Sequence, residues 1–165
     1  MCETRNDEFY MREALRLAEK AEALGEAPVG CVIVKDGEII GRGYNLRESS
    51  GNPLTHAEII AINEASAKVK SFRLCDCELY VTLEPCPMCA GACINSRVER
   101  VIFGASDPKA GSCGSVINLF ELPYNHKPEI TGGVLRDECS GILSRFFLSL
   151  RERNKARKKA KTEEV

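Results

Sequence analysis

The sequence predicts an α/β layer fold with helices packed on a mixed β-sheet. An Asp36-Gly37 pair lies between two short apolar runs, which is a strong signal for a β-hairpin. After it, segments of helical periodicity alternate with short strand-like runs, as is typical of helices that cover a sheet. The 165 residues suit one domain, and neither an internal repeat nor a linker marks a second. We expect the domain to span residues 1–150, with residues 151–165 as a basic C-terminal helix end or a frayed tail.

The first and last helices are predicted from apolar residues that recur every three or four positions between charged ones. The first spans residues 7–24, with Asp7 as its N-cap and Gly25 as its stop. The last runs from about residue 133 to the end of the chain, and its apolar stripe stops at Leu150. Beyond that point the helix is expected to continue into solvent or to fray.

Short strands, helices and loops fill the chain between these two helices. The expected strands are residues 29–34, 38–44, 78–83, 98–104 and 129–131. The expected helical segments are residues 56–69 and 87–95, with a helical turn at 117–122. Residues 45–55 and 105–114 contain Gly, Ser and Pro and are expected to be loops.

The composition favours a globular protein of the cytoplasm, without a membrane partner. Apolar residues make up 44% and charged residues 28%, and no apolar run approaches the roughly 20 residues of a membrane span. Nine cysteines are many for this length, but the number is odd and the N-terminus has no features of an export signal. We therefore expect reduced cysteines, some of which bind a metal while the others are small buried residues.

The net charge of −1 conceals an uneven distribution of charge along the chain. The first 30 residues hold seven acidic and four basic side chains, whereas residues 151–161 hold seven basic side chains and one acidic one. A basic tail on a nearly neutral body is typical of a nucleic-acid contact. The alternative is a solvated, frayed helix end, which charge alone favours slightly.

One histidine and two cysteines have the pattern of a zinc site. Cys86 and Cys89 lie three positions apart at the start of a predicted helix, so their sulfur atoms share one face. A helix N-terminus favours thiolate, which is the form that binds zinc. His56 also opens a predicted helix, and two helix starts facing each other across a sheet can place one imidazole and two thiolates around a tetrahedral Zn²⁺.

The number of ligands indicates a catalytic site. Structural zinc sites usually have four protein ligands, whereas catalytic sites have three and keep a position for water. Water bound to zinc loses a proton near pH 7. Glu58 lies two residues after His56, so it can reach this space without being a ligand and can accept and pass on that proton. Glu58 is therefore the expected catalytic residue.

Other interpretations of these residues stay open at this point. A lone Cys-x-x-Cys could be a redox pair or half of a structural zinc site. Cys93, one helical turn beyond Cys89, could be a fourth ligand, although a small buried residue is the favoured interpretation. Cys75 and Cys77 have no matching pair, so a position in the core is favoured for both.

The two segments that carry this chemistry resemble a known superfamily. His-Ala-Glu at residues 56–58, followed by Pro-Cys-Pro-Met-Cys at residues 85–89, resembles the cytidine deaminase-like superfamily. Within it, the chain is similar over nearly its whole length to the bacterial tRNA-specific adenosine deaminases. The more specific shared segments are residues 28–30, 43–45, 80–92, 104–111 and 125–126, and the Phe-Phe at 146–147 that precedes the basic residues.

The resemblance implies a three-layer α/β/α sandwich around a five-stranded mixed sheet, and a homodimer with one Zn²⁺ per subunit. It also implies hydrolysis of adenosine to inosine at the wobble position of an arginine tRNA. The partner would be the anticodon stem-loop, whose loop bases can be splayed out at less cost than paired bases. Residues 1–150 would then be the deaminase domain, and the basic tail could follow the RNA backbone.

The resemblance further assigns substrate contacts to individual positions. Asn45 would hold the ribose and base region of the target nucleotide, and Val29 would wall the base pocket. Ala57 is also an expected substrate-binding residue. Asp107 would lie near the sugar-phosphate beside the target. Weaker assignments, in or near the groove that binds the loop, are Lys109, Asn125 and His126.

Two rival functions use the same zinc residues. A guanine deaminase, or another deaminase of a free nucleobase or nucleoside, would share all four of them, although the Asp107-Pro108-Lys109 segment and the basic end favour RNA. A non-catalytic zinc-stabilised RNA-binding module would need no carboxylate beside the metal. Glu58 therefore argues against the second rival.

Overall fold

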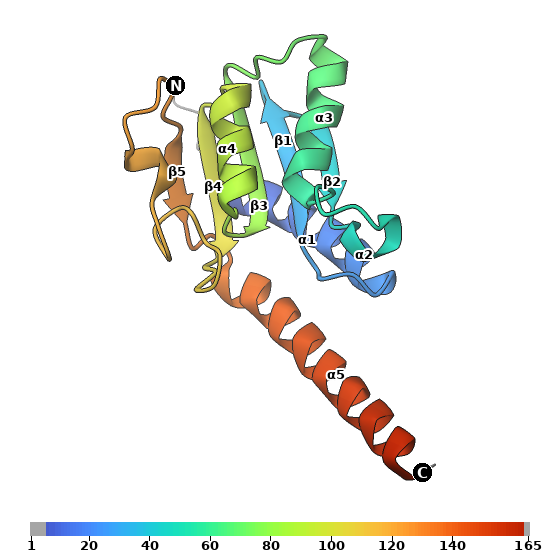
Figure 1. The fold of residues 1–165 in the computed structure, drawn as a ribbon. Helices are drawn as coiled ribbons and strands as arrows, with labels where there is room; N and C mark the ends of the chain where they lie inside the picture. The colour runs from blue at the N-terminus through green and yellow to red at the C-terminus, as the bar shows by residue number, and fades with distance from the viewer. Residues whose placement is uncertain (1–5, 164–165) are drawn as a thin grey trace.

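The computed structural model describes residues 6–163 and shows a five-stranded sheet between two layers of helices (Figure 1). The sheet order is β2-β1-β3-β4-β5. The elements are α1 (Asp7–Ala23), β1 (Gly30–Lys35), β2 (Glu38–Tyr44), α2 (Arg47–Ser50), α3 (Ala57–Val69), β3 (Cys77–Leu83), α4 (Pro87–Ser96), β4 (Arg100–Ala105), η1 (Leu119–Glu121), β5 (Glu129–Gly132) and α5 (Arg136–Glu163). The predicted three-layer α/β/α fold is confirmed.

The sheet is mixed because a hairpin is followed by parallel crossovers. β1 pairs antiparallel with both β2 and β3, whereas β3 with β4 and β4 with β5 are parallel pairs. Asp36 and Gly37 both have positive φ, +50° and +80°, as the tight turn of a two-residue hairpin requires. The predicted hairpin is therefore confirmed.

Each face of the sheet has its own hydrophobic core, since alternate residues of a strand point to opposite faces. Cys31 and Ile33 of β1 pack against α3 and α4, while Val32 and Val34 pack against α1 and the start of α5. Figure 1 shows α3 and α4 together in front of the sheet, with α1 behind it and α5 leaving the body. The predicted site residues of α3 and α4 therefore belong to one layer.

α3 lies unusually close to the sheet because two residues of β2 have no side chain. A Cβ at Gly43 would overlap the carbonyl oxygen of Ala57, and a Cβ at Gly41 would overlap that of Ala61. The backbone of the first turn of α3 therefore rests directly on β2. This contact fixes the height of His56 and Glu58 above the sheet.

Several local predictions were wrong, each for an identifiable reason. The N-cap of α1 is Asn6, whose side chain accepts the Phe9 N–H, because the carboxylate of Asp7 is paired with the buried Arg100 at 3.1 Å. Residues 45–55 are not all loop, since they contain the short helix α2. Cys75 is exposed, because β3 begins only at Cys77.

The last helix begins later than predicted and extends far from the body. Gly133 and Leu135 have positive φ, which is incompatible with the helix, so α5 starts at Arg136. Its apolar residues up to Phe146 pack on the sheet, while residues 151–162 are helical and exposed. In the part of the chain that the structure describes, no helix is both long and apolar enough to span a membrane.

Candidate active site

The three predicted metal ligands meet where α3 and α4 begin. His56 is the N-cap residue of α3, Cys86 is the N-cap residue of α4, and Cys89 lies in the first turn of α4. The Nδ1 atom of His56 is 3.7 Å from the Sγ of Cys86 and 3.6 Å from the Sγ of Cys89. The ligand atoms of the three residues all lie within 4.8 Å of one another.

This donor set fits zinc in both chemistry and size. Tetrahedral zinc with Zn–S of about 2.3 Å and Zn–N of about 2.0–2.1 Å places a nitrogen and a sulfur ligand about 3.6 Å apart. The two nitrogen–sulfur distances here match that spacing. Cys93 is buried deeper in α4 and is not part of the cluster, as the sequence favoured. Three ligands therefore leave the fourth position of a tetrahedral ion for water.

The two cysteines differ in their readiness to lose a proton. The pKa of the Cys86 thiol is lowered to about 4, because Cys89 and His56 both hydrogen-bond to its sulfur. The pKa of Cys89 is raised by the hydrogen bond to Cys86 and by burial. Cys86 is therefore the first of the pair to become the thiolate that a metal needs.

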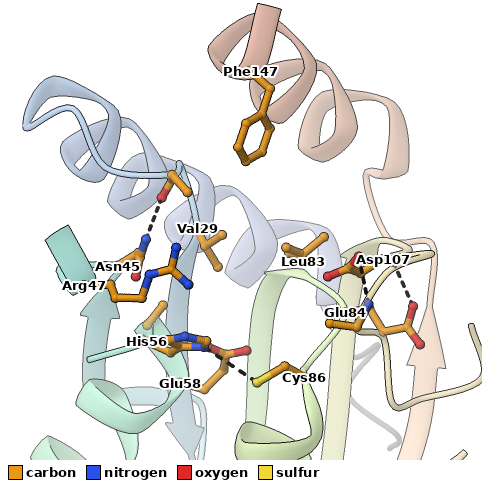
Figure 2. A pocket seen from close by; sticks show the side chains of 13 residues that line it. Val29, Asn45, Arg47, His56, Glu58, Leu83, Glu84, Cys86, Asp107 and Phe147 are labelled. Atoms are coloured by element: carbon orange, nitrogen blue, oxygen red, sulfur yellow. Dashed lines mark hydrogen bonds between the residues drawn. The ribbon is translucent and has the colours of Figure 1, made fainter. Parts of the chain in front are cut away.

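Glu58 lies beside the ligands without belonging to them. It is in the first turn of α3, its side chain is only 4% exposed, and Figure 2 shows its carboxylate next to His56 and Cys86. Burial raises the pKa of Glu58 to about 6. A carboxyl group with a pKa near neutrality can both accept and release a proton, which is the requirement for general acid–base work.

His56, Cys86 and Glu58 line a pocket of about 240 Å³, while the third cluster residue, Cys89, is fully buried and is not part of the lining. Its wall residues come from the segment before β1, from α2 and the start of α3, from the end of β3, from the loop after β4, and from α5. Besides His56, Glu58 and Cys86, the pocket is lined by Ala27, Val29, Asn45, Arg47, Ala57, Leu83, Glu84, Asp107, Ala110 and Phe147 (Figure 2). The lining is therefore mostly apolar, with a few polar groups around the metal site.

The structure brings four of the predicted substrate contacts to this pocket and places three elsewhere. Val29, Asn45, Ala57 and Asp107 line it. Lys109 follows on the same loop as Asp107 but is not a wall residue. Asn125 accepts a hydrogen bond from Arg97, and His126 lies 2.7 Å from the Val98 carbonyl oxygen, both away from the metal pocket. The substrate contacts assigned to all these residues stay predictions.

Sequence reasoning did not assign six of the wall residues to the site, among them Arg47 and Phe147. Arg47 lies in a segment predicted to be a loop, and Figure 2 shows its guanidinium above His56. Phe147 was counted as part of the apolar stripe of the last helix, but its side chain is 42% exposed and points toward the pocket mouth. The signal that could have found Phe147 is its place one residue after Phe146, which already fills the buried face.

Two buried carboxylates hold the pocket walls by accepting N–H groups. Glu26 is fully buried and accepts the N–H groups of Glu48 and Ser49, together with the side-chain amide of Asn45 at 3.5 Å. Burial alone would raise the pKa of Glu26, but these hydrogen bonds outweigh it and hold the pKa below its usual value. Glu26 is therefore an ionised hydrogen-bond acceptor that holds α2 and Asn45 in place.

Glu84 does the same for the opposite wall. Its side chain is 2% exposed and accepts the N–H groups of Asp107, Cys113 and Ser115, as well as the Ser115 hydroxyl. Sequence reasoning gave no role to either carboxylate, because their partners lie 22 to 31 residues away along the chain.

We expect Glu26→Gln to raise KM about tenfold with little change in kcat. The amide is isosteric, but its NH₂ group faces an N–H donor, and an unsatisfied buried donor costs about 1–3 kcal/mol. The wall that carries Asn45 and Arg47 then loosens while the metal site stays intact. Steady-state kinetics would measure this, with Glu22→Gln on α1 as the control. A fall in kcat at unchanged KM would contradict the positioning role.

Comparison with known proteins assigns this chain to a family. Residues 4–105 match the model of the cytidine and deoxycytidylate deaminase zinc-binding region. The tRNA-specific adenosine deaminase of Bacillus subtilis is 53% identical over 154 residues, covering 93% of this chain and 96% of the relative. The protein of that name from Haemophilus influenzae is 52% identical, covering 92% and 89%.

Solved structures agree with this placement. A structure from a study of A-to-I editing by tRNA:A34 deaminases has a TM-score of 0.80 at 38% identity, and the match covers 82% of this chain and 99% of the other. A guanine deaminase from Nitrosomonas europaea has a TM-score of 0.75 at 26% identity, covering 84% and 83%. The chain therefore belongs to the zinc-binding cytidine and deoxycytidylate deaminase family, and within it to the tRNA-specific adenosine deaminases.

Proposed function

We propose that this chain hydrolyses adenosine to inosine, with release of ammonia, at the wobble position of the anticodon loop of an arginine tRNA. The observation that carries the proposal is a three-residue cluster fit for zinc, with the buried, non-ligand Glu58 beside it in the lining of a pocket. Curated relatives at 47–53% identity that bear the name tRNA-specific adenosine deaminase support the choice of substrate.

The proposed chemistry needs one proton carrier. A zinc ion in this site supplies a water that is acidic enough to lose its proton near pH 7. Glu58 accepts that proton and delivers it to a ring nitrogen of adenine, while the water oxygen bonds to carbon 6. Glu58 then takes the remaining proton from the new hydroxyl group and passes it to the amino nitrogen, which leaves as ammonia when its bond to carbon 6 breaks. Its burial beside the metal ligands keeps bulk water away from these transfers.

The walls hold the base over the metal. Val29 and Ala57 contribute apolar surface, and Asn45, fixed by Glu26, offers an amide to the ribose and base region. Asp107 lines the pocket, and its N–H donates to the carboxylate of Glu84. Asp107 is proposed to lie near the sugar-phosphate beside the target. Lys109, Asn125 and His126 are proposed to contact other parts of the RNA loop, outside the metal pocket.

The oligomeric state and the cellular location are proposed by analogy with the same family. We propose a homodimer with one zinc ion per subunit, and a cytoplasmic protein. The eight cysteines that the structure describes are all free, as expected in a reducing compartment.

The deciding experiment measures inosine in an arginine anticodon stem-loop incubated with the purified enzyme. Formation of inosine at the wobble position, with no ammonia from free guanine or cytidine, is the expected result. Ammonia from a free base without inosine in the RNA would favour the free-base alternative. RNA binding without any deamination would instead favour a zinc-stabilised binding module.

A further inference from the structure

Cys86, one of the three metal ligands, lies between two residues that cannot donate a backbone hydrogen bond. Pro85 and Pro87 have no N–H group. β3 has already ended at Leu83, and Cys86 itself has extended backbone, with φ of −72° and ψ of 172°, as the N-cap residue of α4. The position of this ligand therefore depends on α4, which follows it, and on the contacts that hold Glu84 and Pro85 before it.

The loop after β4, residues 106–115, holds the two residues before Cys86. The N–H group of Ser112 donates to the carbonyl oxygen of Pro85 at 2.9 Å. The N–H group of Glu84 donates to the carbonyl oxygen of Ala105, at the end of β4, at 2.8 Å. The carboxylate of Glu84 accepts four more hydrogen bonds from the loop, from the N–H groups of Asp107, Cys113 and Ser115 and from the Ser115 hydroxyl group. The peptide 84–85 is thus attached to the loop through both its backbone and its charged side chain.

The loop also packs directly on the carboxylate that it binds. Gly111 has no Cβ, and a Cβ at this position would overlap the carboxylate of Glu84 and lie 2.5 Å from the carbonyl oxygen of Asp107. Glu84 and Ser112 are both buried, so a hydrogen bond lost here is not replaced by one to bulk water. A shift of the loop therefore moves the peptide before Cys86 with it.

We propose that Glu84 is a positioning residue for the metal ligand Cys86. Its backbone lies two residues before the ligand, while its carboxylate holds the loop whose Ser112 binds Pro85, so these contacts close a ring around the peptide that leads into the ligand. The same loop carries Asp107 into the pocket wall (Figure 2). One carboxylate therefore sets both the metal site and a substrate wall. The effect on the rate of deamination rests on the proposed function, whereas the effect on metal retention does not.

Glu26 provides a matched comparison within the same chain. It is also fully buried, and it also accepts several hydrogen bonds, from residues 45, 48 and 49. The partner nearest to a metal ligand, Ser49, lies seven residues before His56 (49 to 56). The same substitution at the two glutamates therefore loosens two pocket walls, of which only one is attached to the peptide before a ligand.

The test measures how fast the zinc-loaded protein gives up its metal to a chromophoric chelator in the absence of RNA. Groups that orient metal ligands typically contribute 10–100-fold to metal affinity. We expect Glu84→Gln to release zinc about tenfold faster than the parent, because the new NH₂ group faces N–H donors and the loop that binds Pro85 loosens. Glu26→Gln should release zinc at a rate within about twofold of the parent.

A spectroscopic measurement reports on the metal geometry itself. Co²⁺ in place of zinc absorbs light in bands whose energies depend on the arrangement of its ligands. We expect these bands to shift in Glu84→Gln and to stay in place in Glu26→Gln. Ser115→Ala keeps the carboxylate and removes a single hydroxyl donor from it, and it should speed zinc release two- to threefold. This milder variant decides the question if Glu84→Gln does not fold, which circular dichroism would reveal.

Unchanged zinc release from Glu84→Gln would overturn the positioning role, and so would equal increases in Glu84→Gln and Glu26→Gln, because they would indicate general loosening. In the inosine assay, Glu84→Gln should lower kcat about tenfold, in contrast to the rise in KM expected for Glu26→Gln. A parent enzyme that formed no inosine would refute the proposed function, yet zinc release from the two variants would still test the role of Glu84.

Discussion

Glu58→Gln enzyme is expected to form inosine at least about a thousandfold more slowly than the parent, while it keeps its zinc and its RNA affinity. General acid–base groups contribute roughly 10²–10⁴-fold to rate. The upper part of that range applies because Glu58 is the buried carboxylate beside the metal cluster. In the proposed mechanism it also serves several proton transfers. Glutamine has the same shape but can neither accept nor return a proton.

Single-turnover inosine formation measures the rate of the chemical step. Metal analysis measures the zinc content, and an equilibrium binding assay measures the RNA affinity. Glu64→Gln is the matched control, because Glu64 lies on the same helix and its carboxylate only accepts the Arg42 N–H at 3.3 Å. Undiminished ammonia release by the Glu58 variant would show that Glu58 takes no part in the reaction.

Cys86→Ala is expected to abolish both stable zinc binding and deamination. Two remaining ligands do not make a structural or catalytic zinc site, and the residue lost is the thiol whose pKa is lowered to about 4. Because metal binding also stabilises the folded state, the unfolding temperature should fall relative to the zinc-loaded parent. Zinc content after dialysis against a chelator is the measurement.

Two other cysteines serve as controls for this result. Cys75→Ala removes an exposed thiol outside the pocket, and it should leave zinc content and activity unchanged. Cys93→Ala should also keep zinc, because Cys93 is not in the metal cluster. Loss of zinc in the Cys93 variant would show a fourth protein ligand and would contradict the open coordination position.

The metal cluster was predictable because its geometry is local. Cys86 and Cys89 are one turn of a single helix, and a proline after the first of them marks where that helix begins. His56 and Glu58 likewise belong to the first turn of one helix. Only the meeting of the two helix starts had to be assumed, and the alternating pattern of helices and strands made that assumption reasonable.

The walls were not predictable to the same degree because they depend on distant partners. Nothing near Glu26 in the sequence indicates that it will accept the N–H groups of residues 48 and 49. The spacing of Phe147 fits the apolar stripe of α5. The rest of the domain does not cover this residue, however, so its side chain is partly exposed and faces the pocket mouth. The N-cap of α1 was misplaced for a similar reason, since the ion pair with Arg100 takes Asp7 away from its helix end.

The close contact between Gly43 and the first turn of α3 has a consequence for redesign. His56 and Glu58 are carried by one rigid piece of backbone, so the metal ligand and the proton carrier cannot be adjusted separately. A change of base preference that keeps the chemistry is therefore best sought in wall residues outside that turn, such as Val29 and the segments 45–49 and 107–115, and each of these segments is tied down by one carboxylate. Ala57, by contrast, is a wall residue that shares the backbone turn of His56 and Glu58, so a change there moves the wall and the chemistry together.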